Sequence, residues 1–401
     1  MNNQNCCDSG NKESQTDEID KETKIGGCCE ANVLAYSSEG TSGCRGGSAK
    51  PTSVPLTHYD KNDHWVVGDI KTFSGIVPQI TPELIFKDTL GSWKVRLGIN
   101  RMNYKINPGI YAIGVPDNDS PVLVTANYKL SFDALRKELS DINAWILVLD
   151  TKGINVWCAA GKGTFGTKEL VSRISKTKLY EIVSHRRLIL PQLGAPGISA
   201  HEVSKNTGFK VIYGPVRAKD IKTFIQSGRK VTDKMRKVRF NTYDRLVLTP
   251  IELVGTFKLS LMIFGSLFLL NLIAVTPFGV VDFYAYAGAI IIGCVLTPLL
   301  LPLIPGRSFA WKGWLLGFLW ALSVNVLNGW PQDPSYSWVR ALGYLLILPS
   351  ISSYYAMNFT GSSTYTSLSG VLKEMKIAVP GIFISIGIGI ILILANSFIT
   401  V

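Results

Sequence analysis

Apolar residues follow two different patterns along the chain. Before about residue 257, short apolar runs alternate with charged segments, whereas beyond it several stretches of 18 or more residues contain no Asp, Glu, Lys or Arg. Runs of that length match the roughly 20 residues needed to cross the hydrocarbon core of a bilayer. The pattern therefore predicts a soluble part followed by a membrane part.

The first pattern is typical of an α/β domain. From about Leu84 to Leu248, β-branched runs alternate with helical segments, which indicates a succession of βαβ units and a mainly parallel, Rossmann-like sheet. The run 144–149 is almost wholly apolar, as expected of a central parallel strand covered on both faces. The predicted strands are 110–115, 122–125, 144–149, 187–190 and 209–213.

Helices are predicted between these strands. Ser131 is expected to cap a helix in which Phe132, Leu135 and Leu139 share one face. Ser199 and Glu202 form a capping-box pattern for a helix that Gly208 ends. Two more helices are predicted at 167–174 and 218–227.

The second pattern predicts an all-α membrane domain of five transmembrane helices. With the preceding segment in the cytoplasm, the inside loops carry Arg307, Lys312, Lys373 and Lys376, whereas 277–282 and 328–337 carry no Lys or Arg. This distribution follows the positive-inside rule, so we expect a multi-pass protein of the cell membrane with a cytoplasmic α/β domain. We expect no buried charged side chain inside a span and hence no ion pathway. The predicted spans are 258–276, 283–304, 311–327, 339–357 and 377–398.

The N-terminal segment differs from both parts. Residues 1–52 are rich in Asn, Ser, Gly, Glu and Lys and contain five of the seven cysteines. Few large apolar residues occur there, so burial cannot offset the entropy of ordering, and we expect a disordered tail. The predicted organisation is a tail at 1–52, an α/β domain at 53–248 and a transmembrane domain at 249–401.

The chain carries a net charge of +12, and many of its basic residues are concentrated in one segment. Ten Lys or Arg residues lie between Arg217 and Arg245, directly before the first apolar run. A basic segment beside a membrane span is attracted to anionic lipid headgroups. We therefore expect membrane lipid, and not nucleic acid, as the partner of this charge.

Three loops follow predicted strand ends and are candidates for one ligand site. In open α/β sheets, ligands bind beyond the carboxyl ends of the strands. The candidate residues are Thr125, Asn127 and Tyr128 in the first loop, the loop from Trp157 to Gly166, and Gly194, Ala195, Pro196 and Gly197 in the third.

The segment Gly161-Lys-Gly-Thr-Phe-Gly166 fits the G-x-G-x-x-G pattern of dinucleotide-binding proteins. A nicotinamide-dependent oxidoreductase is therefore one alternative. The segment lies well inside the α/β domain and not in its first βα turn, which weakens this interpretation. A P-loop is excluded, because Gly163 stands where that motif has Ser or Thr.

Cys158 is the single cysteine of the predicted α/β domain, and its residue pattern fits two roles. A free cysteine is often a small buried hydrophobe. Cys158 also stands before a Gly-rich loop, near Lys162 and a following helix N-terminus, features that favour a reactive or metal-binding thiolate. No C-x-x-C or zinc-like spacing occurs in the sequence, and no Asp-x-His-x-x-Gly motif offers a histidine ligand for cobalamin.

The segment Asn155-Val-Trp-Cys-Ala-Ala-Gly-Lys162 resembles the signature of the HgcA family, the membrane-anchored corrinoid proteins of microbial mercury methylation. The resemblance continues through Leu188-Ile-Leu-Pro-Gln-Leu-Gly-Ala-Pro-Gly197, 211–215 and the five predicted spans, and so covers roughly residues 85–401. A soluble relative of that family is the corrinoid iron-sulfur protein of the acetyl-CoA pathway. The long Cys-bearing tail departs from the family.

The resemblance implies a corrinoid-dependent methyltransferase. Cys158 would be the lower axial ligand to the cobalt of a base-off, Cys-on cobalamin, and the methyl group would pass as a carbanion equivalent to Hg(II). The residues implied around the cofactor are Asn155, Val156, Trp157, Ala159, Ala160, Gly161, Lys162, Gly163 and Thr164.

The resemblance also implies two partners, a two-cluster ferredoxin-like electron donor and a folate-linked methyl donor system. Two alternatives stay open beside the oxidoreductase. One is a corrinoid methyl carrier of the acetyl-CoA-pathway type, and the other is a non-catalytic membrane adaptor or transporter subunit with a regulatory α/β domain.

Overall fold

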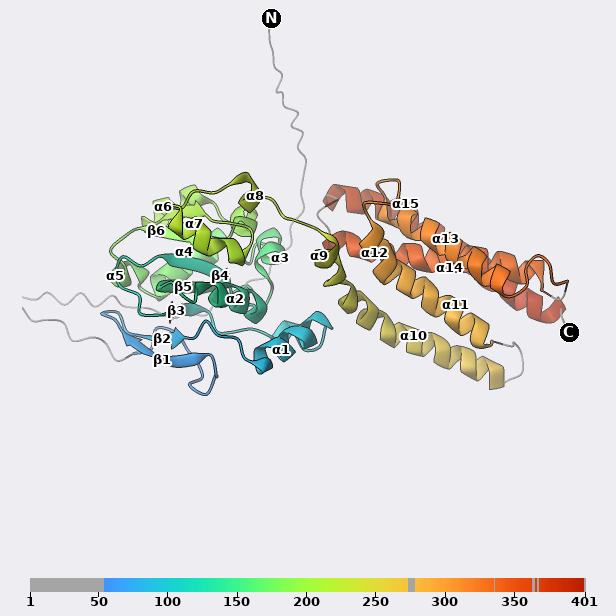
Figure 1. Cartoon of the computed structure of the whole chain (residues 1–401), viewed down its shortest axis with the longest axis horizontal. Coiled ribbons are helices and arrows are strands. Elements are labelled where there is room, and N and C mark those ends of the chain that lie inside the picture. Colours follow the sequence, from blue (N-terminus) through green and yellow to red (C-terminus); the bar gives the residue numbers. More distant parts are fainter. Residues whose placement is uncertain (1–53, 273–277, 335, 363–364, 366–367, 400–401) are drawn as a thin grey trace, which may run out of the picture. The chain divides into compact units, whose positions relative to one another are not determined.

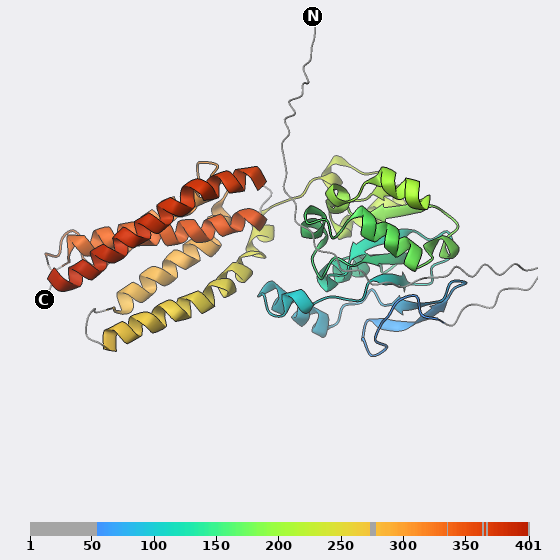
Figure 2. The ribbon, with the colours of Figure 1, turned by 180° about the vertical axis from the view of Figure 1, so that it is seen from behind.

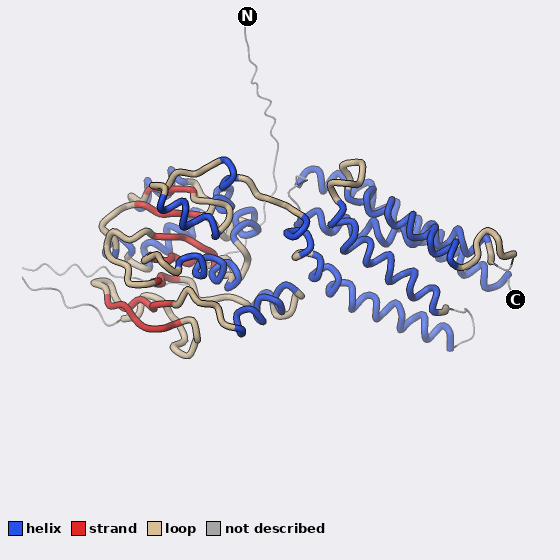
Figure 3. Tube along the Cα trace, viewed as in Figure 1, coloured by secondary structure: helices blue, strands red, loops and turns tan. Residues whose placement is uncertain are grey.

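The computed structural model describes residues 54–272, 278–334, 336–362, 365 and 368–399 (Figure 1). The predicted tail at 1–52, with five of the cysteines, lies outside the described residues. The described chain comprises a part with strands and helices and a C-terminal part made of helices (Figure 3).

The first part contains a mixed seven-stranded sheet in the order β1-β2-β3-β5-β4-β6-β7. Strands β5, β4, β6 and β7 are parallel to one another, whereas β3 pairs antiparallel with β5. Strand β2 is parallel to β3, and β1 is antiparallel to β2. The strands are β1 (Val66–Lys71), β2 (Ile76–Ile80), β3 (Gly109–Ile113), β4 (Val122–Ala126), β5 (Ala144–Leu149), β6 (Arg187–Leu190) and β7 (Lys210–Tyr213).

The five predicted strands are confirmed as β3 to β7, and the prediction of a mainly parallel sheet holds for β4 to β7. Strand β3 runs opposite to β4 because only the eight residues 114–121 connect the two strands, too few for the crossover that parallel strands need. Strands β1 and β2 were not predicted. Strand β1 forms the edge of the sheet and alternates partly buried and exposed residues, whereas β2 lies between β1 and β3 and buries Val77 and Ile80.

Helices cover both faces of this sheet, as the two opposite views in Figures 1 and 2 show. In β5, Trp145, Leu147 and Leu149 pack on one face with residues of α3 to α6, and the alternate residues pack on the other face with α2 and α7. The helices of this part are α1 (Phe86–Arg96), α2 (Lys129–Arg136), α3 (Val156–Gly161), α4 (Thr167–Lys176), α5 (Leu179–Ile182), α6 (Ala200–Thr207), α7 (Ile221–Gln226) and α8 (Asp233–Arg236).

Most predicted helices are confirmed, with one shifted start. Helix α2 begins two residues before Ser131 with Tyr128 as its N-cap, so Ser131 is not the cap. Phe132 and Leu139 are buried against the sheet as predicted. Ser199 caps α6 by accepting a hydrogen bond from the Glu202 amide, and Gly208 ends that helix at a φ of 76°.

The C-terminal part contains four helices that are long and apolar enough to cross a membrane, within Thr242–Leu269, Val280–Leu300, Phe309–Leu327 and Ser369–Asn396. They correspond to four of the five predicted spans. The helices are α9 (Thr242–Leu246), α10 (Thr249–Leu272), α11 (Val280–Ile291), α12 (Thr297–Leu300), α13 (Phe309–Leu327), α14 (Trp338–Asn358) and α15 (Leu368–Ile399), with a π-helical segment at Ile292–Leu296 between α11 and α12.

The fifth predicted span, 339–357, forms α14, which is not among those four apolar helices. Its serines are buried, and Ser352 and Ser353 donate hydrogen bonds to the carbonyls of Ala289 and Ala310 on neighbouring helices. Such packing satisfies polar side chains internally, so α14 has a less apolar composition than a helix that faces lipid.

The expectation that no charged side chain is buried in a span is wrong. Lys312 of α13 is buried, and its ammonium donates to the Leu301 carbonyl. Arg340 pairs with Asp282 at 3.1 Å, close to the first turns of α14 and α11. Each of these charges has a partner within the helical part, which is how such groups are tolerated there.

Candidate functional site

The candidate site lies where the parallel strands β4 and β6 end side by side. After β4 the chain enters α2 on one face of the sheet, whereas after β6 it enters α6 on the opposite face. Connections that diverge in this way open a crevice beyond the strand ends, which is where α/β sheets bind ligands.

A cavity of about 310 Å³ occupies this crevice. Its walls are mostly apolar and come from the ends of β4 and β6, from α2, from the first turn of α3 and from the segment after β7. The predicted site residues Thr125, Asn155, Val156 and Trp157 all line it. Lining residues that the sequence did not single out include Ser131, Leu135, Ile189, Pro191, Leu193 and Arg217.

Asn155 fixes the start of α3 at the edge of the cavity. Its backbone is extended, with φ −64° and ψ 160°, and its side-chain oxygen accepts a hydrogen bond of 2.9 Å from the Cys158 amide. Val156, Ala159 and Ala160 bury the opposite side of the helix in the sheet-facing core. This packing holds the helix in one orientation and leaves the side chains of Trp157 and Cys158 exposed.

Cys158 is an exposed free cysteine, so the interpretation as a small buried hydrophobe is wrong. The indole of Trp157 beside it is 41% exposed. Burial raises the pKa of the Tyr128 phenol, whereas the charges of Arg101 and Arg96 lower it. The Tyr128 side chain is buried and does not line the cavity.

The Gly-rich loop joins two helices. Gly161 ends α3, and Gly166 is the N-cap of α4. Gly163 adopts a φ of +77°, and open space surrounds the positions where Gly161 and Gly163 would carry a side chain. Since the segment does not connect a strand directly to a helix, it lacks the context of a dinucleotide fingerprint. It does leave open space at the end of α3, the helix that carries Cys158.

Gly194 and Gly197 lie in the 3-10 segment Gln192–Gly197 and make close packing possible. A Cβ atom at Gly194 would lie 2.4 Å from the Phe165 ring, and one at Gly197 would lie 2.2 Å from the Phe165 carbonyl oxygen. The Phe165 ring is fully buried. These glycines thus bring the loop after β6 against the loop that follows Cys158.

Asn127 is buried and connects the end of β4 to the turn after β5. Its side-chain oxygen accepts hydrogen bonds from the Thr151 amide at 3.0 Å, the Thr151 hydroxyl at 2.9 Å and the Gly153 amide at 3.0 Å. Its amide nitrogen donates to Asp150 at 3.2 Å. Asn127 therefore acts on the turn that precedes Asn155 and does not itself line the cavity.

The three predicted loops converge at one end of the sheet, but they play different parts. Thr125, Asn155, Val156 and Trp157 line the cavity, and Asn127 and the 194–197 loop support the segment around them. Cys158 and the residues 161–164 do not line it. Ala195 and Pro196 belong to the supporting loop. Among the missed lining residues, Ile189, Pro191 and Leu193 lie at or just after the end of β6, whereas Ser131 and Leu135 belong to α2.

The donor set at this site favours a ligand that needs a single soft donor. Among the described residues, no group of three or more His, Cys, Asp or Glu side chains is placed to hold a metal ion. One exposed thiol, an exposed indole, two glycines facing open space and an adjoining apolar cavity fit a large, flat cofactor whose metal takes one protein ligand.

Comparisons with known proteins concern the segment that contains this site. Residues 99–225 match the family of the CO dehydrogenase/acetyl-CoA synthase delta subunit. The chain is 34% identical over 128 residues to the acetyl-CoA decarbonylase/synthase complex subunit gamma of Archaeoglobus fulgidus. These matched residues cover 31% of this chain and 27% of that protein. The corresponding subunit of Methanopyrus kandleri is 33% identical over 124 residues, covering 30% and 26% of the two chains.

The corrinoid/iron-sulfur protein large subunit of Moorella thermoacetica is 28% identical over 139 residues, which covers 34% of this chain and 31% of that protein. The chain thus spans about a quarter to a third of the length of these curated relatives. The matched segment is related to proteins of the acetyl-CoA pathway that include a corrinoid protein.

Proposed function

Residues 99–225 are related to corrinoid proteins of the acetyl-CoA pathway, and from this relationship we propose that the α/β part is a Rossmann-like corrinoid-binding domain that serves methyl transfer. The observation that carries the proposal is the exposed Cys158 on a capped helix at the crevice between β4 and β6. When bound, a corrinoid supplies a cobalt atom able to carry a methyl group.

We propose that the Cys158 thiolate would hold the cobalt of the corrinoid, in the base-off, Cys-on form. Asn155 orients the turn that presents the thiol, and the exposed indole of Trp157 offers a flat apolar surface beside it. The open space at Gly161 and Gly163 admits a large ring, and the adjoining cavity accepts an apolar extension. No histidine lines that cavity.

A thiolate ligand favours transfer of methyl as a carbanion equivalent, because it donates electron density to the metal, as an axial thiolate does at haem iron. Inorganic Hg(II) is an electrophile that accepts such a group. The function that we propose is therefore corrinoid-dependent methylation of Hg(II) to methylmercury. The resemblance of Asn155–Lys162 to the mercury-methylation signature supports this substrate.

A corrinoid that gave up methyl as a carbanion equivalent would need electrons from a donor before it could be methylated again. The described residues offer no cluster of Cys or His for an iron-sulfur centre. We therefore propose a separate two-cluster ferredoxin-like donor, together with a folate-linked methyl donor system.

For the membrane part, we propose five spans, with α14 as the fifth, and a cytoplasmic corrinoid domain. Four apolar helices and the distribution of Lys and Arg between the loops support this topology. Charges such as Arg340 and Asp282 would then lie near the outer ends of their helices, where they cost less than at the bilayer centre.

The relatives favour a second candidate, a methyl carrier of the acetyl-CoA-pathway type. Such a carrier gives methyl as a cation equivalent and gains nothing from a thiolate ligand. The two candidates therefore differ in their dependence on Cys158.

The test is replacement of Cys158 in the full chain loaded with cobalamin. Cys158→Ala is expected to shift the visible absorption of the bound corrinoid and to abolish methylmercury formation, because the axial donor is lost. Cys294→Ala removes the buried thiol of the helical part and serves as the control. Methylmercury formation at the native rate by Cys158→Ala, or an unchanged spectrum, would contradict thiolate ligation.

A further inference from the structure

Helix α1 carries an exposed apolar stripe. Phe86, Leu90, Trp93 and Leu97 follow one another at intervals of four, three and four residues, so they lie along one side of the helix and its C-cap. Phe86 is 72% exposed, Trp93 57% and Leu97 37%. Single exposed apolar residues are ordinary, but a row of large ones marks a contact surface.

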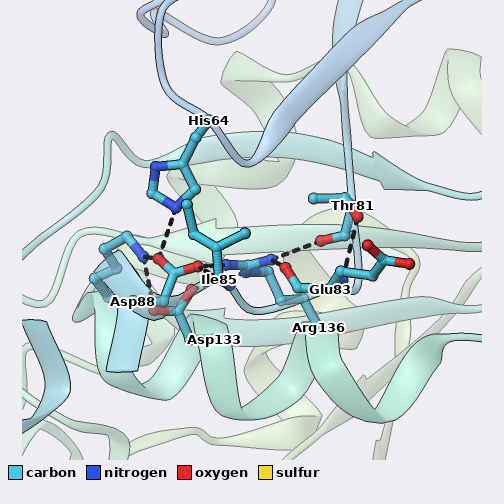
Figure 4. Close-up of polar contacts among 8 residues, drawn as sticks. His64, Thr81, Glu83, Ile85, Asp88, Asp133 and Arg136 are labelled. Atoms are coloured by element: carbon cyan, nitrogen blue, oxygen red, sulfur yellow. Dashed lines mark hydrogen bonds and ion pairs between the residues drawn. The ribbon is translucent and has the colours of Figure 1, made fainter. Parts of the chain in front are cut away.

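The opposite side of α1 is fastened to the α/β domain. Asp88 and Val95 are buried there, seven positions apart. The Asp88 carboxylate accepts hydrogen bonds from Lys129 at 2.6 Å, Arg136 at 2.8 Å and His64 at 2.9 Å (Figure 4). Because this side is held by three partners, the apolar stripe is held facing away from the domain.

Basic side chains flank the stripe on both sides. Lys87 and Lys94 lie along one edge and Arg96 along the other, as their positions in the helix require. Between residues 84 and 105 there are five basic side chains and one acidic side chain, Asp88, which is buried in its own ion pairs. The accessible charge of residues 84–105 is therefore positive, and the exposed Glu83 directly precedes them.

We propose that α1 lies in the headgroup region of an anionic bilayer, with Phe86, Trp93 and Leu97 among the upper acyl chains and Lys87, Lys94 and Arg96 at the lipid phosphates. An apolar face bordered by Lys and Arg is the composition of interfacial helices, whose long basic side chains reach to the headgroups. The same chain has four helices apolar enough to span a membrane, so a bilayer is available to it. This contact goes beyond the proposed methyl transfer and does not depend on it.

The test measures what surrounds Trp93 in the full chain, reconstituted in nanodiscs of phosphatidylcholine and phosphatidylglycerol. The emission of Trp93 is the difference between the native chain and Trp93→Phe. Lipids brominated near the carboxyl end of the acyl chain are expected to quench most of this emission, whereas acrylamide in the water is expected to quench little of it.

Two results would overturn the proposal. If acrylamide quenches Trp93 and brominated lipid does not, the stripe faces water. If neither quencher reaches Trp93, protein covers the stripe, either the chain's own helices or a second copy.

The charge of the lipid is tested with matched variants. Lys87→Gln, Lys94→Gln and Arg96→Gln together are expected to lower the quenching by brominated lipid, as is high salt. Lys168, Lys176 and Lys205 are exposed on α4 and α6, on the other face of the sheet, and their triple change to Gln is the control with equal charge loss. Quenching that is equal in all three proteins, or undiminished in pure phosphatidylcholine, would remove anionic lipid as the partner.

Discussion

Asn155 determines where the Cys158 thiol lies. A single hydrogen bond joins its side-chain oxygen to the Cys158 amide, and the extended backbone at Asn155 turns the chain abruptly into α3. A six-residue helix has little intrinsic stability, so its start depends on the cap and on three buried apolar residues. The position of the proposed ligand is therefore set three residues before it.

We expect Asn155→Ala to weaken corrinoid binding without removing the ligand. Loss of an N-cap lowers helix stability by about 1 kcal/mol, and the helix destabilised here is the one that presents the thiol. Titration of the full chain with a cobinamide, which lacks the nucleotide base, should show a higher Kd and a less defined shift of the absorption bands.

Asn155→Ser should restore most of both signals, because serine is also an N-cap residue. An Asn155→Ala protein that binds cobinamide as the native chain does would show that the cap does not position the ligand.

The sequence identified the residues around Cys158 better than it identified their roles. Cys158, Asn155 and Trp157 stood out through a specific motif, but the exposure of the thiol follows from the burial of Val156, Ala159 and Ala160 on the other side of α3. Asn127 and Gly197 were predicted beside the cofactor, and their contacts within the protein depend on distances between loops that no local pattern contains.

At the scale of elements, α1 depends on a buried ion cluster more than on apolar packing. Arg136 is fully buried and donates to Asp88, to Asp133 and to the carbonyls of Thr81 and Glu83 (Figure 4). These bonds join α1 and the chain before it to α2. A buried charge that keeps all its partners is tolerated, whereas the loss of one partner leaves an uncompensated charge.

The pKa of Asp88 gives this attachment a dependence on pH. Burial raises the pKa of its carboxyl, but hydrogen bonds and charges from Lys129, Arg136 and His64 outweigh burial and lower the pKa from 3.8 to about 2. A carboxyl whose pKa is lower in the folded chain stabilises the fold above its unfolded pKa, and that contribution is lost as the pH falls toward the folded value.

We therefore expect the free energy of urea unfolding of the α/β part to drop by roughly 2 kcal/mol between about pH 4 and pH 2 through Asp88 alone. Asp88→Asn should be less stable at neutral pH and should lack this part of the acid dependence. Asp60→Asn, a change at an exposed carboxyl, is the control. An Asp88→Asn protein with the same acid profile as the native chain would assign the stability to other groups.

Complete burial makes a strand easy to predict, but a strand can be predicted without it. Strand β5 is buried at every position and reads as one apolar run, whereas β7 was predicted although it is only partly buried. The edge strand β1 alternates partly buried and exposed residues and was missed, as was its neighbour β2. The start of α2 was predicted too late in the sequence, because Ser131 is a residue type preferred at the N-cap. In the structure the N-cap is Tyr128. The preference of serine for the N-cap position was thus outweighed by the direction in which the chain leaves β4.

At the scale of the whole molecule, the share of polar residues in a helix depends on what surrounds that helix. Helices α10 and α15 carry charged residues only in their N-terminal parts and are apolar beyond them, whereas α14 buries serines and carries Arg340. A helix surrounded by other helices satisfies polar groups through its neighbours, as Ser352 does at the Ala289 carbonyl. Under the proposed topology of five spans, hydropathy alone undercounts the spans.

The proposed orientation predicts which loops a membrane-impermeant maleimide reaches in intact cells. Gln332→Cys, in the exposed loop between α13 and α14, should be labelled from outside. Arg307→Cys, in the exposed loop between α12 and α13, should be labelled only after permeabilisation, because the loops rich in Lys and Arg face the cytoplasm. The reverse pattern would place the α/β part outside the cell.

The bonds of Asn127 bear on how tightly a cofactor is held. With three donors on its oxygen, the turn at 150–153 is already ordered by the protein before any ligand arrives. The conformational entropy of that turn is then lost during folding and is not subtracted from the affinity of binding. Asn127 thereby makes the site preorganised, so that the empty and loaded forms are expected to share one loop conformation.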